Sequence, residues 1–329
     1  MSRDSLETIR HMTPTQLRAY SAVVRHGSVK AAAAEIGVTE AAVSLHLGQL
    51  RKELDDQLFT RTAAGLAFTP GGLRLASRAA EMLGLQAQTI REVNQAGHGR
   101  RLMRLATTSL FAEHAAPGLI ELFLARADDF DVELSVRPPS QFETLLASRA
   151  VDVAIGPRIS SASNALVCKP FLNYHVVAVV GVGHPLATVA PRSAQLREQT
   201  WLLGPSAAGE DGVVPAMLRH FDIPEERQRI FQSHAAALEE AKRNNGVALA
   251  VSFAVAADLA NGRLVVIKGP GLQADGGWAT MTLPEHVIVP AAAELTRFVS
   301  TPRAIQAMMK GSGVHIGHFR PSVHVTLWK

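Results

Sequence analysis

Apolar residues in the first 55 positions recur at helical spacing in three short stretches. The first stretch covers residues 15–26, the second 29–36 and the third 40–54, and a glycine follows each of the first two. Ser28 and Thr39 precede the second and third stretches, where a hydroxyl can accept from the first free N–H groups of a helix. The pattern therefore predicts three helices separated by tight, glycine-containing turns.

The third predicted helix has a narrow apolar stripe. Val43, Leu47, Leu50 and Leu54 follow one another at intervals of 4, 3 and 4, which places them on one face. A short helix, a turn with glycine and a second helix with a single buried face are typical of a helix-turn-helix, whose second helix enters the DNA major groove. The alternative is an ordinary three-helix core.

A two-stranded wing and a long helix are predicted next. Residues 58–68 alternate weakly, and Thr69 with Pro70 forms a helix start. The helix continues to about Gln95, a rod of roughly 37 Å, and its apolar residues step by 3 and 4 as in a coiled-coil seam. These are Leu73, Ala76, Ala80, Leu83, Ala87 and Ile90. Dimerisation through this helix is preferred over packing on its own domain, and residues 97–99 look like a hinge.

From Arg101 onwards, predicted strands alternate with predicted helices. This alternation predicts an α/β fold with a parallel sheet and helices on its faces. About 230 residues exceed the usual size of one domain and suggest two lobes, with chain crossings near 171–175 and 267–271. The predicted strands are 102–108, 132–136, 151–156, 174–181, 229–232, 247–251 and 264–267, and the predicted helices are 113–127, 141–148, 213–221 and 235–244.

Composition narrows the class of protein. The chain has 329 residues, 47% of them hydrophobic, and one cysteine, Cys168, so a disulfide scaffold is excluded. The apolar run Val176–Val182 is too short to span a membrane, and the N-terminus shows no export signal. The first 100 residues hold 12 basic and 9 acidic side chains, a small excess that suits nucleic acid. We expect a cytoplasmic protein without a membrane partner.

The chain resembles the LysR-type transcriptional regulators from about Met12 to about Met309. The matching stretches are LRAYSAVVRHGSVKAAAAEIGVTEAAVSLHLGQLRKEL, LFTRTAAGLAFTPGG, VDVAIG, GHPLA, NNGVALAV and NGRL, in that order. The tail GVHIGHFRPSVHVTLW looks similar to actinobacterial relatives that regulate carbon monoxide dehydrogenase or carbon fixation genes.

The resemblance implies a domain organisation and a set of partners. Residues 1–69 would form a winged helix-turn-helix headpiece of all-α type, 70–97 a dimerising linker helix, and 100–329 an effector domain like the type 2 periplasmic binding proteins. Its lobe I would cover about 100–171 and 270–329, and its lobe II about 172–269. The implied partners are double-stranded promoter DNA, a small-molecule effector, a homodimer that assembles into a homotetramer, and RNA polymerase.

Ten headpiece residues are candidate DNA contacts. On a helical wheel, Ala41, Ser44, Leu45, Gly48, Gln49 and Lys52 lie opposite the buried stripe. Hydroxyl and amide groups can read base edges, and Leu45 can contact a thymine methyl. Cations can neutralise phosphate, although Arg61 could equally be a solvated loop charge. The full set is Ser28, Lys30, Thr39, Glu40, Ala41, Ser44, Leu45, Gln49, Lys52 and Arg61.

The third helix departs from the family pattern. The family often has Gln-Pro after the cap and arginines where this chain has Leu45 and Gly48, so direct base readout by arginine is largely missing. Glu40 would repel phosphate unless it accepts from a cytosine amino group. Its simpler role is that of a first-turn acid that stabilises the helix N-terminus.

The effector would bind where strand ends meet helix starts, because free N–H groups there favour anions. We therefore expect a small carboxylate or phosphate metabolite. Each hydroxyl could instead be a plain helix cap. The candidate residues are Thr107, Thr108, Ser109, Pro139, Gln141, Gly204, Ser206, Ser233 and His234.

No catalytic, cofactor or metal motif stands out. GxxxxGK[ST], GxGxxG after a strand, HExxH and GxSxG are absent. His315, His318 and His324 could hold a metal, but VHVTLW reads more simply as a terminal strand. The sequence therefore predicts a regulator with no cofactor and no catalytic residues. The alternatives are an enzyme or solute-binding protein on the same two-lobed fold, and a molybdate-responsive regulator, which would have a small all-β sensing module.

Overall fold

The computed structural model describes residues 12–63, 65–98, 101–126, 130–158, 165–209 and 212–310. The chain divides into two compact units, each described here by itself. The first comprises Met1–Asn94 with Ala147–Ala150, and the second Gln95–Leu146 with Val151–Lys329. The histidine-containing tail lies outside the described residues.

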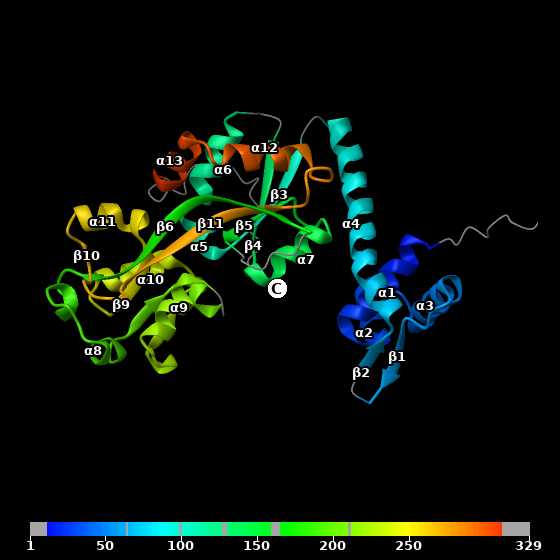
Figure 1. Ribbon diagram of the computed structural model, residues 1–329, viewed down its shortest axis with the longest axis horizontal. Coiled ribbons are helices and arrows are strands. Elements are labelled where there is room, and N and C mark those ends of the chain that lie inside the picture. The colour runs from blue at the N-terminus through cyan, green and yellow to red at the C-terminus, as the bar shows by residue number, and fades with distance from the viewer. Residues whose placement is uncertain are drawn as a thin grey trace, which may run out of the picture. The chain divides into compact units, whose positions relative to one another are not determined.

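The three predicted N-terminal helices are present (Figure 1). They are α1 (Pro14–His26), α2 (Val29–Ile36) and α3 (Glu40–Leu54). Gly27 and Gly37 end the first two in the left-handed conformation, with φ of 62° and 70°, which costs glycine little. The hydroxyls of Ser28 and Thr39 accept from the N–H groups of Ala31 and Ala42, so both predicted caps are confirmed.

The predicted wing and the predicted long helix are also present. Strands β1 (Phe59–Thr62) and β2 (Gly65–Phe68) pair antiparallel, and Thr69 accepts from the Gly72 N–H at the start of α4 (Pro70–His98). A hinge was expected at residues 97–99. The structure shows helix instead at the first two of these positions, because α4 continues through Gly97 and His98. One glycine in the last turn costs only about 1 kcal/mol relative to alanine.

Helix α4 packs against the hydrophobic core of the first unit, but only some of its apolar side chains are buried there. Leu75 and Ala79 are buried against the core that α1, α2, α3 and the wing form, and Ala76 and Leu83 pack at its edge. Gly72 passes so close to the wing that a Cβ atom would lie 1.9 Å from the carbonyl oxygen of Leu58. The helix therefore packs on its own unit at two positions of the predicted seam. Other large apolar side chains stay exposed, namely Leu73, Met82, Leu85, Ile90 and Val93.

The second unit is built on one sheet with the strand order β4-β3-β5-β11-β6-β9-β7-β8, and β10 also pairs with β6. Parallel pairing was expected throughout, but the sheet is mixed. Pairs β3–β4, β3–β5, β7–β8 and β7–β9 are parallel, whereas every pairing of β6 or β11 is antiparallel. The strands are β3 (Arg101–Thr107), β4 (Phe130–Val136), β5 (Val153–Pro157), β6 (Val167–Gly181), β7 (Trp201–Leu203), β8 (Gln228–Ile230), β9 (Val247–Val251), β10 (Leu264–Val266) and β11 (Gln273–Thr282).

The long strands β6 and β11 join the two halves of this sheet, as Figure 1 shows. Sequence analysis placed one crossing at 171–175, which lies inside β6. The other crossing was placed at 267–271, but the chain returns through β11, where Asp275 pairs with His175 and Trp278 with Leu172. The register shifts between Trp278 and Ala279, so a bulge bends the paired strands at this point. The result is a two-lobed domain.

The helix predicted at 113–127 is two helices, α5 (Ser109–His114) and α6 (Ala116–Leu124). Pro117 lies at the start of α6 and has no N–H to continue the hydrogen-bond ladder of α5. The remaining α-helices are α7 (Phe142–Ala147), α8 (Ser193–Arg197), α9 (Val213–His220), α10 (His234–Lys242), α11 (Ala256–Ala260), α12 (Pro290–Phe298) and α13 (Pro302–Lys310). Helices α8, α11, α12 and α13 were not predicted.

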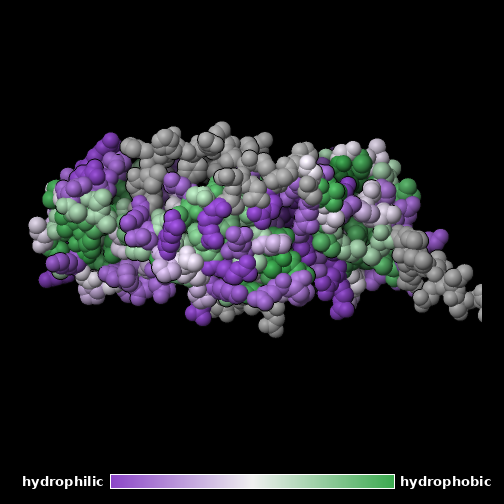
Figure 2. Space-filling view, turned by 90° about the horizontal axis from the view of Figure 1, so that it is seen from above, coloured by the Kyte–Doolittle hydropathy of each residue, from purple (hydrophilic) through white to green (hydrophobic). Residues whose placement is uncertain are grey.

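Hydrophobic side chains fill both faces of the second unit's sheet. The largest cluster contains Phe111, Trp201 and Trp278, and a second cluster covers β9 and α10. Figure 2 shows that hydrophobic patches on the visible surface are interrupted by hydrophilic residues. Within the described ranges, no helix is long and apolar enough to cross a membrane.

Candidate nucleic-acid interface and effector site

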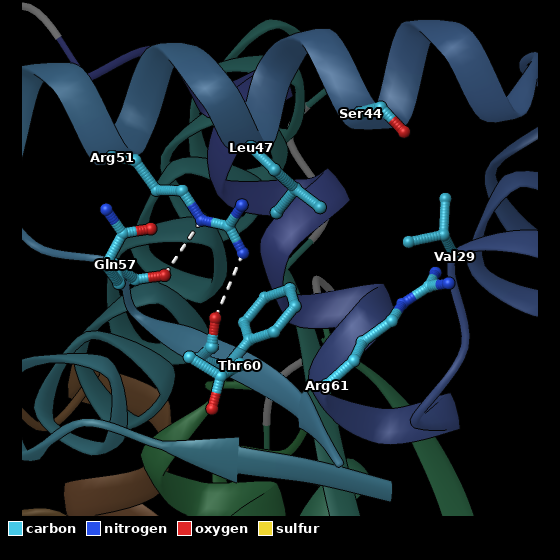
Figure 3. A pocket seen from close by; sticks show the side chains of 8 residues that line it. Val29, Ser44, Leu47, Arg51, Gln57, Thr60 and Arg61 are labelled. Carbon is cyan, nitrogen blue, oxygen red and sulfur yellow. Dashed lines mark hydrogen bonds between the residues drawn. The ribbon is translucent and has the colours of Figure 1, made fainter. Parts of the chain in front are cut away.

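A surface notch of about 470 Å³ lies where α2, α3 and the wing meet (Figure 3). Its lining includes Val29 from the first turn of α2, Ser44 from α3 and Arg61 from β1. Figure 3 shows the Arg61 side chain extending towards Val29, with Ser44 on the helix above. Two predicted DNA contacts from separate elements are thus brought to one notch, where a cation and a helix N-terminus both favour an anion such as phosphate.

Arg51 fixes the wing against α3. Its Nε donates to the Gln57 carbonyl at 2.8 Å and its Nη2 to the Phe59 carbonyl at 3.1 Å. The guanidinium also lies 4.8 Å from the centre of the Phe59 ring, within the range of a cation–π contact. The helical wheel did not reveal Arg51, because this arginine does not face DNA but positions β1 and therefore Arg61.

The α3 surface opposite the buried stripe is exposed, as the wheel predicted. Leu45 keeps 60% of its surface exposed, and Gly48 has open space around its Cα. Gln49 is exposed, but its Oε1 accepts from Gln16 of α1 at 3.2 Å. One end of this amide is therefore engaged within the protein. The exposed α3 candidates are Glu40, Ala41, Ser44, Leu45, Gln49 and Lys52.

The remaining headpiece candidates sit at helix starts. Ser28 and Thr39 cap α2 and α3 with their hydroxyls, and Lys30 is exposed on the first turn of α2. Glu40 is the acid in the first turn of α3, where a negative charge stabilises the helix N-terminus.

The effector candidates in the first half of the sheet lie near the carboxyl ends of parallel strands. Thr107 is fully buried, and its hydroxyl donates to the Ile155 carbonyl at 2.8 Å. Thr108 precedes α5 without capping it through its side chain, and Ser109 is half-buried. Pro139 and Gln141 form the short turn before α7, and Gln141 is exposed.

Three candidates in the second half meet around one histidine. The Oγ of Ser206 lies 2.9 Å from the Nε2 of His234. Ser233 caps α10 by accepting from Ala236. At Gly204, a Cβ atom would lie 2.3 Å from the His234 ring, so only glycine lets the ring pack here.

Glu113 joins this group, and sequence analysis missed it. Its Oε2 accepts from both Nδ1 and the backbone N–H of His234 at 2.8 Å, and its Oε1 accepts from the Ala235 N–H at 2.6 Å. Burial alone would raise the pKa of Glu113, but these hydrogen bonds and the His234 charge outweigh burial and lower the pKa to about 2. A separation of 121 residues hid the pairing.

His114 lies beside the same cluster. Its ring centre is 5.4 Å from that of His234, and burial together with His234 lowers the pKa of His114 to about 4. Its Nε2 is buried and has no hydrogen-bond partner among the described residues. Within the same ranges, no group of histidine, cysteine and acidic residues could hold a metal ion.

Comparisons with known proteins agree with this architecture. Residues 14–73 match the bacterial regulatory helix-turn-helix protein model of the lysR family, and residues 96–301 match the LysR substrate binding domain. An HTH-type transcriptional regulator of Mycobacterium tuberculosis is 62% identical over 96% of this chain and 100% of its own length. The RuBisCO operon transcriptional regulator of Allochromatium vinosum is 25% identical over 89% of this chain and 97% of its own.

A solved structure shows the same fold. ArgP from M. tuberculosis superposes with a TM-score of 0.59 at 18% identity, covering 90% of this chain and 97% of that one. The headpiece, the two-lobed domain and these matches define a DNA-binding transcriptional regulator with a substrate-binding domain. The chain belongs to the LysR family.

Proposed function

We propose that this regulator reads promoter DNA through the notch and the exposed face of α3, and that its two-lobed domain senses a small anionic metabolite. The meeting of Ser44, Arg61 and the α2 N-terminus in one notch carries the proposal. In this scheme residues 1–69 bind DNA, 70–97 dimerise, and 100–329 bind the effector. The lobe limits are those given from the sequence.

The contacts divide into two kinds. Ser28, Lys30, Lys52 and Arg61 anchor the sugar-phosphate backbone, which sets position and affinity without selecting sequence. Ser44 and Gln49 read base edges, and Leu45 packs on a thymine methyl. Thr39 and Glu40 hold the start of α3, and Ala41 allows close approach.

Oligomerisation follows from the exposed side chains of α4. Leu85, Ile90 and Val93 keep 49%, 53% and 67% of their surfaces exposed, and such residues on one helix favour a partner helix. We propose a homodimer through α4 that assembles into a homotetramer in the cytoplasm and contacts RNA polymerase.

Sequence readout is tested with Ser44→Ala and Gln49→Ala. Each variant should bind the chain's own upstream DNA about 5- to 150-fold more weakly, the range for 1–3 kcal/mol per base contact, and should bind random DNA as the unmodified protein does. Equal losses on both DNAs would remove the base-reading role.

For the effector pocket, a double Thr108→Ala and Ser206→Ala variant should lose its DNA-binding response to metabolites.

A further inference from the structure

The carboxylate of Glu113 occupies the N-terminus of α10. A helix N-terminus attracts anions because its first N–H groups have no partner within the helix. Here the N–H groups of His234 and Ala235 both donate to Glu113. The protein itself therefore supplies the anion that an effector would otherwise bring to this position.

The two partners come from opposite halves of the sheet. Helix α5, which carries Glu113, follows β3, whereas α10 packs on β7 and β9. Strands β5, β11 and β6 lie between β3 and β9 in the sheet. The hydrogen bonds of Glu113 therefore hold the two halves together across the long strands that connect them.

The His234 ring extends this contact into the second half. An ionised carboxylate only accepts hydrogen bonds, so the His234 Nδ1 carries the proton that points at Glu113. The opposite nitrogen, Nε2, meets the Ser206 hydroxyl at 2.9 Å. We call Glu113, His234, Ser206 and the Ala235 N–H the Glu113 clasp.

His114 gives an independent sign that a ligand belongs here. This histidine is 6% exposed, and its Nε2 has no hydrogen-bond partner in the described part of the chain. A buried polar atom without a partner is costly, and a ligand that reached the clasp could supply the missing hydrogen bond.

We propose that Glu113 is a built-in substitute for an effector carboxylate, and that an anionic effector acts by displacing it from α10 and releasing the Glu113 clasp. Displacement would exchange one carboxylate for another at the same N–H groups, so the helix start stays satisfied while the contact between the halves is lost. We call the effect of this displacement on DNA binding the gating role, and it rests on the proposed sensing function. The occupancy, meaning that the Glu113 carboxylate fills the N-terminus of α10, does not rest on that function.

Chemical rescue of full-length Glu113→Ala by formate tests whether the Glu113 carboxylate fills the N-terminus of α10. We expect this variant to melt several degrees below the unmodified protein, and excess sodium formate to restore at least half of the loss relative to sodium chloride at equal ionic strength. Formate should not stabilise the unmodified protein, because Glu113 already fills the site. Glu121→Ala, which removes an exposed carboxylate on α6, is the matched control and should show neither effect.

Two outcomes would overturn the occupancy: no rescue of Glu113→Ala, or equal stabilisation of the unmodified protein by formate. Should Glu113→Ala fail to fold, Glu113→Gln keeps the size and removes the charge. Amide exchange at residues 234 and 235 should then accelerate on the order of tenfold, and unchanged exchange would overturn the proposal.

DNA binding separates the gating role from the occupancy. Glu113→Ala should change affinity for the upstream DNA at least threefold, and formate should leave that change in place, because free formate satisfies the N–H groups of His234 and Ala235 without linking α10 to α5. Rescue of melting temperature with unaltered DNA affinity would overturn the gate alone. Failure of the unmodified protein to prefer its upstream DNA would instead count against the proposed function, with the formate result unaffected.

Discussion

The hydroxyl of Tyr20 donates a 2.7 Å hydrogen bond to the backbone carbonyl of Gly72. Tyr20 is fully buried in the headpiece core, and Gly72 lies in the first turn of α4. Burial and the nearby Asp56 charge raise the pKa of Tyr20 to about 12, so the phenol stays a neutral donor. This bond links the DNA-binding helices to the start of the long helix.

Tyr20→Phe removes that bond while keeping the ring. We expect the free energy of unfolding to fall by about 1 kcal/mol, the usual net value of a neutral hydrogen bond, as measured by urea denaturation. Thr15→Ala, at an exposed position on α1, is the control and should change stability by less than about 0.5 kcal/mol. A Tyr20→Phe midpoint equal to that of the unmodified protein would show that the bond contributes nothing.

Arg61→Ala should weaken binding to all DNA sequences alike. Loss of one phosphate contact lowers the slope of log K against log salt by about 0.9, which anisotropy titrations over a salt series would measure. Lys268→Ala removes an exposed cation from the other unit and should leave the slope unchanged. An unaltered slope in Arg61→Ala would mean that Arg61 is a solvated charge on β1 without a phosphate contact.

A double Ile90→Asp and Val93→Asp variant should dissociate the dimer. Charges at these exposed positions of α4 would be buried without partners in a helix–helix seam, which is strongly unfavourable. Sedimentation velocity at micromolar concentration should show a lower mass, whereas Ser77→Asp, at an exposed position on the opposite face of α4, should retain the dimer. The same mass for both variants would place the interface elsewhere.

His114 should make the protein less stable in mild acid. Its pKa is about 4 in the folded state against an ordinary value of 6.5, so between these values the unfolded chain binds the extra proton. Stability is then lost as pH falls from 6.5 towards 4. The loss from pH 7 to pH 5 is about 2 kcal/mol, at about 1.4 kcal/mol per pH unit below 6.5.

The contribution of His114 is isolated by comparing variants in urea at both pH values. His114→Gln should lose about 2 kcal/mol less than the unmodified protein between pH 7 and pH 5. The control His175→Gln removes a histidine that is more than half exposed and should follow the unmodified protein. Identical pH dependence in His114→Gln would contradict the lowered pKa.

Local signals in the sequence predicted the headpiece well. Helix caps and terminators act within a few residues, so Ser28, Thr39 and Gly37 located the ends of α2 and α3. The wheel of α3 separated buried from exposed residues because only one face of that helix packs on the core.

Contacts between segments that lie far apart in the chain could not be predicted from the sequence. Strand β11 was not predicted, and its antiparallel pairing with β5 and β6 makes the sheet mixed. Glu113 was missed for the same reason, since its partners lie more than 120 residues away. Two of the predicted seam positions, Ala76 and Leu83, pack on the headpiece instead, which periodicity cannot distinguish from packing on a second helix.

The central claim is sequence-specific DNA binding by the headpiece. Fluorescence anisotropy of the full-length protein with its own upstream DNA and a scrambled control, over a salt series, tests it most directly. We predict a clear preference for the upstream DNA and a steep negative salt slope. Equal, weak binding to both DNAs would contradict specific recognition of the upstream region.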